Sequence, residues 1–136
     1  MGLVPGLASS VQIVVTDTDT MKAMGTGDLP VLATPRLLAL AGAAAVAAVA
    51  PSLESGVTSV GTSAVMEHKR PSPIGAEVLV RAELTEVDGR RLVFNFIARQ
   101  KQTSGSPDHE HAVVATGTVE RVLVDRARFL SRASHV

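Results

Sequence analysis

The segment that decides the fold is residues 37–51, "LLALAGAAAVAAVAP", where fourteen consecutive residues carry no polar group and most are alanine. This run is shorter than the roughly 20 residues that a bilayer span requires. The preceding "MGLVPGLASS" (1–10) lacks the basic charge of a secretory signal. Thr34 is a suitable N-cap, Pro35 fits the first helical position and Pro51 ends the pattern. We therefore expect a helix that is apolar all round, buried on most faces and closely approached by a sheet.

Length and composition exclude several classes of protein. The 136 residues suit one domain, and 46% of them are hydrophobic, which is enough for a sizeable core. Thirteen Lys and Arg balance thirteen Asp and Glu, and only 2% of residues are aromatic, so we expect no nucleic-acid or membrane partner. The chain has no cysteine, hence no disulfide, thiolate nucleophile or Cys-based zinc site. That composition is compatible with a reducing cytoplasm, where we expect the protein to reside.

The rest of the chain reads mainly as strands. Alternation in residues 56–70 places Val60, Thr62, Ala64, Met66 and His68 on one face. Asp88-Gly89 indicates a tight hairpin turn. We predict one α+β domain over 1–136 with flexible ends at 1–9 and 134–136, in which the four strands after the helix can pair as an antiparallel meander. The expected strands are 10–20, 56–70, 76–87, 90–102 and 112–125, with a polar loop at 103–111 and a short amphipathic helix at 126–133.

Three segments together resemble one known family. The stretches "GDLPVLATPRL" (27–37), "VGTSAVMEH" (60–68) and "EVDGRRLVF" (86–94) are similar to the fluoroacetyl-CoA thioesterase-like family, and the resemblance extends over residues 12–130. It implies the hotdog fold, an antiparallel sheet wrapped around a long central helix. It also implies an acyl-CoA substrate, a site at a subunit interface, and a homodimer or a dimer of dimers. The coenzyme A would be part of the substrate, and no other cofactor and no metal are implied.

The resemblance assigns residues as well. The family's hydrolysis of a thioester is attributed to a threonine before the helix, a glutamate within it and a histidine on the next strand, and these positions fall on Thr34, Gly42 and His68. The chain thus lacks the carboxylate, and His68 would be the base with Thr34 donating a hydrogen bond. Asp28 lies in a loop that could approach the site, and Gly61 could mark a strand bulge or allow a ligand to approach the strand. Since 21–33 contains no aromatic residue, the phenylalanine lid that the family links to fluorinated substrates is not expected.

Each of these residues also has a simpler interpretation. The simpler interpretations are a plain N-cap for Thr34, a structural or solvated histidine for His68, a simple kink for Gly61 and a packing glycine for Gly42. A polar loop explains the histidines around Glu110, His109 and His111, better than a metal site does. Four cations are candidates for the phosphates of coenzyme A, or else solvated charges: Lys69, Arg70, Arg90 and Arg91.

Three functions compete on this reading. The first is an acyl-CoA thioesterase that works with Thr34, His68 and water. The second is a non-catalytic module that binds acyl-CoA or a small ligand, which the glycine at position 42 favours. The third is a structural dimer subunit, which retention of Thr34, His68 and Gly61 disfavours. A hotdog hydratase is a weaker fourth candidate. It would need an Asp/His pair in the segment that leads into the helix, and "LPVLATPRLL" (29–38) contains neither residue.

Overall fold

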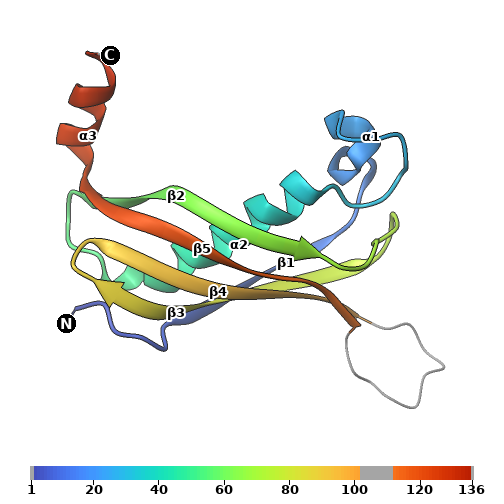
Figure 1. The fold of residues 1–136 in the computed structure, drawn as a ribbon, viewed down its shortest axis with the longest axis horizontal. Coiled ribbons are helices and arrows are strands. Elements are labelled where there is room, and N and C mark those ends of the chain that lie inside the picture. The colour runs from blue at the N-terminus through green and yellow to red at the C-terminus, as the bar shows by residue number, and fades with distance from the viewer. Residues whose placement is uncertain (1, 102–111, 136) are drawn as a thin grey trace.

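A curved five-stranded sheet holds one long helix against one of its faces (Figure 1). The computed structural model describes residues 2–101 and 112–135. The strands are β1 (Ala8–Val14), β2 (Val57–His68), β3 (Glu77–Asp88), β4 (Arg91–Gln100) and β5 (Ala112–Asp125). The helices are η1 (Asp17–Asp19), α1 (Met21–Met24), α2 (Thr34–Val49), η2 (Ala50–Ser52) and α3 (Arg126–Ala133). This is the α+β hotdog arrangement that the resemblance implied.

The strands lie in the order β1-β3-β4-β5-β2, and every neighbouring pair is antiparallel. Only β3, β4 and β5 form a meander, so the prediction that all four strands after the helix pair in sequence is wrong. The connection from β2 to β3 contains Pro71 and Pro73 and is too long for a tight hairpin. β2 pairs with β5 instead and forms an edge of the sheet, with β1 at the other edge.

Helix α2 buries one face and leaves the other open. Its buried residues are spaced three or four apart and pack on the inner face of the sheet: Leu37, Leu40, Ala41, Ala44, Ala45, Ala48 and Val49. On the opposite side Ala39, Ala43 and Ala47 are exposed, and Val46 is 43% exposed. The expectation that α2 is buried on most faces is therefore wrong for the single chain. Together with η2 the helix reaches 19 residues, so length and composition alone would let it cross a membrane, although its buried face packs as a core helix does.

A bulge in β2 changes which side chains face the helix. The pairing with β5 shifts between Gly61 and Ser63, as expected if the glycine marks a bulge. Beyond the bulge Ala64, Met66 and His68 lie on the helix side, but Val60 and Thr62 do not share that face. The extra residue reverses the alternation, which is why the uninterrupted pattern predicted from the sequence fails.

The remaining elements fall close to their predicted positions, except that β1 ends six residues before the predicted strand 10–20 does. β1 begins at Ala8 and ends at Val14, because the "DTD" segment that follows closes into η1 through hydrogen bonds with the Thr16 backbone and side chain. The β3–β4 hairpin turns at Gly89 and Arg90, between the paired Asp88 and Arg91, with Gly89 at a φ of +61°. Helix α3 covers the predicted residues 126–133, and Asp125 is its N-cap. The predicted loop at 103–111, with His109, Glu110 and His111, lies outside the described residues.

Candidate functional site

Two connecting segments bring the start of α2 and the end of β2 together. The Leu32 amide donates a hydrogen bond to the carbonyl of Ser72 (2.8 Å), and Val31 forms an isolated bridge with Pro73. The Lys69 amide donates to the carbonyl of Val114 (2.7 Å), which anchors the chain as it leaves β2. These backbone contacts place residues 34 and 68, distant in sequence, beside each other.

Thr34 and His68 are hydrogen-bonded, with 2.8 Å between Thr34 Oγ1 and His68 Nδ1. Both residues come from one chain, so their contact does not require a second subunit. Thr34 is the first residue of α2 and makes no capping hydrogen bond, because the N-cap is Ala33. The Thr34 hydroxyl is therefore directed at the histidine, and its interpretation as a simple N-cap is wrong.

The environment of His68 favours its neutral form. Burial lowers the pKa of the imidazole, and the nearby Arg70 backbone offsets this only in part. Nε2 is buried and has no hydrogen-bond partner within the described part of the chain. Of the two ring nitrogens, Nδ1 is thus the one in contact with a reactive group, and a neutral imidazole can accept the Thr34 proton there.

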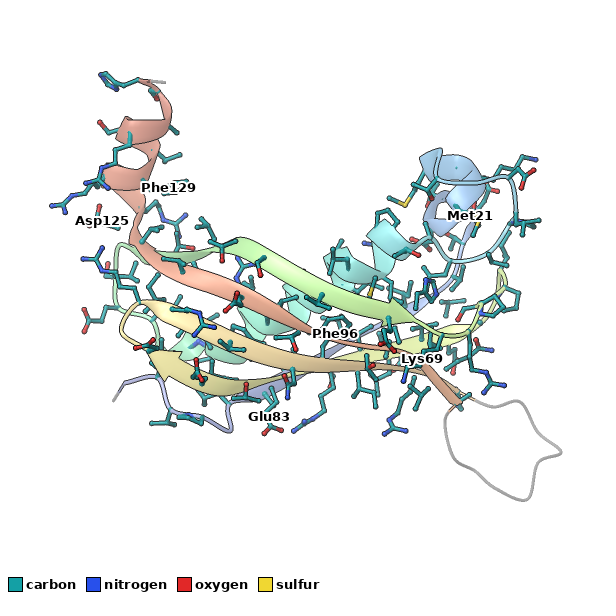
Figure 2. All side chains as sticks on the ribbon, viewed as in Figure 1. Met21, Lys69, Glu83, Phe96, Asp125 and Phe129 are labelled. Atoms are coloured by element: carbon teal, nitrogen blue, oxygen red, sulfur yellow. The ribbon has the colours of Figure 1, made fainter. Side chains whose placement is uncertain are left out.

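An open cleft of about 230 Å³ surrounds the pair. Met21, Val31 and Leu32 form its apolar side, while Lys69 and Arg70 bring positive charge to the other. Figure 2 shows Met21, on α1, and Lys69, just after β2, at the same end of the molecule. Two of the four cations proposed for coenzyme A phosphates therefore lie at this cleft.

An ion pair that the sequence pattern did not predict anchors the first turn of α2. Arg36 Nε donates to Asp19 Oδ1 at 2.8 Å, which joins the first turn of α2 to η1. Burial by itself would raise the pKa of Asp19, but hydrogen bonds from the Thr16 backbone and from Arg36 outweigh it and lower the pKa. The sequence shows acidic residues in "DTDT" (17–20) and a basic residue, Arg36, in the first turn of the predicted helix. Nothing in the sequence shows that Asp19 and Arg36 pair with each other.

The other predicted site residues lie away from this cleft. Gly42 follows Thr34 by eight residues, or about 12 Å along the helix, and a Cβ built on it would meet no atom within 4 Å. Gly61 lies on the exposed middle of β2, about 20 Å from His68 along the strand. Asp28 is exposed in the loop after α1 and does not line the cleft. Within one chain the structure gathers Thr34 and His68 and leaves these three apart.

The remaining cations have other surroundings. Arg91 pairs with Glu86 (2.6 Å) and with Glu120. Arg90 lines a separate cavity beside α3. Arg121, which the sequence analysis did not single out, donates to the side chain and carbonyl of Ser59, and burial lowers its pKa. Within 2–101 and 112–135 no group of three or more His, Asp or Glu side chains forms a potential metal site.

Known proteins match this chain in sequence and in structure. The family model described as FlK, fluoroacetyl-CoA-specific thioesterase, matches residues 15–127. The fluoroacetyl-CoA thioesterase of Streptantibioticus cattleyicolor is 41% identical over 85 residues. That alignment covers 62% of this chain and 61% of the relative, which is less than two thirds of the relative's length.

Solved structures match over nearly the whole chain. The fluoroacetyl-CoA thioesterase FlK superimposes with a TM-score of 0.84 at 29% identity, covering 99% of this chain and 98% of that one. A variant of FlK in complex with acetyl-CoA gives a TM-score of 0.85 at 27% identity, with 98% of each chain covered. A thioesterase superfamily member from Thermus thermophilus, at 21% identity and a TM-score of 0.85 over 97% and 91% of the two chains, shares the fold. The chain belongs to the fluoroacetyl-CoA-specific thioesterase family of hotdog proteins.

Proposed function

We propose that this protein hydrolyses a coenzyme A thioester at the Thr34–His68 pair, without a further cofactor. The observation that carries the proposal is the 2.8 Å contact between Thr34 Oγ1 and His68 Nδ1 at an open cleft. A hydroxyl bonded to a neutral imidazole is the minimum needed to activate an oxygen nucleophile. Membership of the thioesterase family and the acetyl-CoA complex of FlK support a thioester of coenzyme A as the substrate.

The geometry suggests a two-step reaction. His68 Nδ1 accepts the hydroxyl proton while Thr34 Oγ1 attacks the thioester carbonyl, and the resulting imidazolium protonates the sulfur as the C–S bond breaks. A water molecule, losing its proton to the same nitrogen, then cleaves the acyl-threonine ester. The products are a carboxylic acid and free coenzyme A, and both Thr34 and His68 return to their starting protonation states.

Stabilisation of the oxyanion would come from the helix start and the adjacent cations. The first amides of a helix have no partner within the helix and can bind an anion. Pro35 has no N–H, so Thr34 and Arg36 provide the donors at the first three positions. Lys69 and Arg70 line the same cleft and add positive charge. This arrangement favours negative charge where the tetrahedral intermediate would develop it.

The glycine at position 42, in place of the family's carboxylate, is consistent with slow hydrolysis and also with the alternative of a non-catalytic binding module. The family resemblance places a carboxylate at this position, and here a side chain is absent although space is open around the Cα. A missing general base typically costs 10²–10⁴-fold in rate. The alternative, a non-catalytic module that binds acyl-CoA, differs from a slow thioesterase only in whether product forms.

The proposed working form is a homodimer, which could pair further into a dimer of dimers. β2 is an edge strand, residues 61–65 at its centre are all exposed, and Val65 is 70% exposed. The adjoining outer face of α2 exposes Val46 and several alanines. A second copy pairing through β2 would satisfy the free edge and cover this apolar face.

Binding and turnover must be measured on the same samples to test the proposal. A panel of acyl-CoAs is incubated with the wild type, Thr34→Ala and His68→Gln, with Thr85→Ala and His135→Gln as controls at exposed positions. We expect saturable hydrolysis in the wild type and both controls, and loss of it in the two site variants. Saturable binding with no hydrolysis in the wild type would instead establish the binding module.

A further inference from the structure

The segment "KRPSPIG" (69–75), which joins β2 to β3, passes along the wall of the cleft. Figure 1 shows this connection at the same end of the molecule as α1. Pro71 lines the cleft, whereas Ser72 is buried and does not line it. Prolines on both sides restrict the backbone of Ser72 to extended conformations. The Ser72 carbonyl accepts a hydrogen bond from the Leu32 amide at 2.8 Å, so this serine is held next to the segment that leads into α2.

Two buried side-chain atoms have no hydrogen-bond partner within residues 2–101 and 112–135, and they are His68 Nε2 and Ser72 Oγ. Buried polar groups in folded proteins almost always have partners, because an unpaired donor or acceptor keeps the whole cost of its desolvation. Burial lowers the pKa of His68, and the Arg70 backbone partly opposes this effect, so the connection after β2 passes close to the imidazole. The two unpaired atoms therefore belong to one region beside the Thr34–His68 pair.

The proposed reaction requires one particular tautomer of His68. Nδ1 faces the Thr34 hydroxyl at 2.8 Å, and it can accept the Thr34 proton only if it carries no hydrogen of its own. The hydrogen of the neutral ring is then on Nε2, where it needs an acceptor. Without an acceptor the other tautomer is favoured, in which Nδ1 donates to Thr34 and cannot act as a base. The partner of Nε2 thus determines whether the pair can react.

The other groups around His68 cannot be that acceptor. On β5 the residue paired with His68 is Ala115, and on α2 the contact is Thr34, which is already bonded to Nδ1. Lys69 and Arg70 are the charged residues that line the cleft with His68, and their side chains only donate hydrogen bonds. The Ser72 hydroxyl, by contrast, can accept two hydrogen bonds and donate one.

We propose that Ser72 is a positioning residue for the reaction, whose hydroxyl accepts, through one buried water, the hydrogen bond that His68 Nε2–H donates. The Arg70 backbone nearby offers a carbonyl as well, so the water would have the two to four polar partners that a buried water requires. This hydrogen bond holds the hydrogen on Nε2 and leaves Nδ1 free to accept the Thr34 proton. The inference rests on the proposed function, because it explains how the base of that reaction is kept in its active tautomer.

The test compares Ser72→Ala with Ser72→Thr, which keeps the hydroxyl, and with Ser55→Ala, which removes an exposed hydroxyl in the turn before β2. Nitrogen NMR of the imidazole reports the tautomer, and His68→Gln assigns the signals. We expect the wild type, Ser72→Thr and Ser55→Ala to carry the hydrogen on Nε2. Ser72→Ala should shift the ring toward the Nδ1–H tautomer, and it should lower the pKa of His68 further, because the imidazolium also loses an acceptor.

The kinetic effect should appear in kcat and not in KM. Ser72 does not line the cleft, so KM for an acyl-CoA should be unchanged in all the serine variants. We expect kcat to fall about 10- to 100-fold in Ser72→Ala, as the loss of one buried hydrogen bond predicts. Ser72→Thr should restore kcat, and Ser55→Ala should leave it at the wild-type value.

An unchanged tautomer and an unchanged pKa of His68 in Ser72→Ala would overturn the inference, because another acceptor would then hold Nε2–H. A fall in kcat without a change of tautomer would also overturn it, since a purely structural role of Ser72 would explain that result. The proposed function is tested separately, because the NMR measurement needs no turnover. If the wild type hydrolyses no acyl-CoA while Ser72→Ala changes the tautomer, the function fails and the link between Ser72 and His68 stands.

Discussion

At the scale of single residues, the Thr34 hydroxyl could bond either to the helix backbone or to a side chain. A threonine at a helix start commonly caps the backbone, but here Ala33 takes the N-cap position and Thr34 contacts His68 at 2.8 Å. The hydrogen bond links the start of α2 to the end of β2, which are 34 residues apart in the sequence. A side chain freed from the backbone in this way can change partners during a reaction, because the helix does not depend on it.

The pH dependence of hydrolysis should follow His68. Burial holds the pKa of His68 below its ordinary value of 6.5, and only the neutral imidazole can accept the Thr34 proton. We expect kcat/KM to rise with pH through this lowered pKa and to be level above pH 6.5. NMR titration of the His68 ring should give the same pKa as the rate profile. A rate that continues to rise well above pH 7 would mean that another group is the base.

The lowered pKa of His68 also makes the stability of the fold depend on pH. Between the lowered pKa and 6.5 the unfolded chain binds more protons at His68 than the folded protein does. The free energy of unfolding therefore rises with pH across this window, and the stability is lost as the pH falls through it. His68→Gln should remove this part of the pH dependence in urea titrations.

Sequence reasoning could identify Thr34 and His68 as site residues only through the family resemblance. Neither the spacing of 34 residues nor the local pattern reveals that they are in contact. Contacts such as Leu32–Ser72 and Asp19–Arg36 depend on how the connections pack, and no periodicity encodes that. Gly61 is different, because a glycine within a strand is itself a signal for the bulge that the structure contains.

At the scale of elements, α2 has room for the missing carboxylate. A Cβ at position 42 meets no atom within 4 Å, so Gly42→Glu should fold, and replacing a helical glycine adds up to about 1 kcal/mol of helix stability. If the position corresponds to the family's carboxylate and dimer formation brings it to the cleft of the partner subunit, the rate should rise about 10²–10⁴-fold. Gly42→Gln is the matched control, with the same shape and no charge. Equal rates in the two folded variants, checked by circular dichroism, would argue against a vacated base.

The connection between η1 and α2 should stabilise the fold and orient the site. Asp19 is only 8% exposed and accepts hydrogen bonds from Thr16 and Arg36. Asp19→Ala should lower the free energy of unfolding by about 1–3 kcal/mol, the usual cost of losing hydrogen bonds to a charged group. Urea denaturation measures this change, and Asp17→Ala, at an exposed neighbour, is its control. A loss no larger than that of the control would show that the ion pair contributes little.

Strand prediction worked where the alternation is unbroken. In β4, and in β3 up to the register shift that follows Leu84, the predicted inward residues are all buried, including Val78 and Phe94. In β2 the bulge reverses the faces, and the pairing with β5 depends on long-range packing. Helix α2 was located correctly from its apolar run and prolines, but its composition does not show which face the chain itself covers.

At the scale of the whole molecule, the open β2 edge and the outer face of α2 imply a partner. We expect a dimer by light scattering at micromolar concentration. The chain has no cysteine, so Ser63→Cys introduces a single thiol at the centre of the exposed run 61–65 of β2. If two copies pair antiparallel through this run, oxidation should give a disulfide-linked dimer. Thr85→Cys, exposed on β3, should remain monomeric on a non-reducing gel. Cross-linking of both variants to the same extent would indicate random collision instead of a β2 interface.

The central claim is that Thr34 and His68 act as one catalytic unit, and a double-mutant cycle tests it most directly. The absence of cysteine allows thiol release from an acyl-CoA to be followed with a thiol reagent without background from the protein. Residues that act as a unit are strongly non-additive. We predict that Thr34→Ala, His68→Gln and the double variant all lower kcat to about the same extent. Losses that multiply in the double variant, or a wild type that binds acyl-CoA and releases no thiol, would contradict the account.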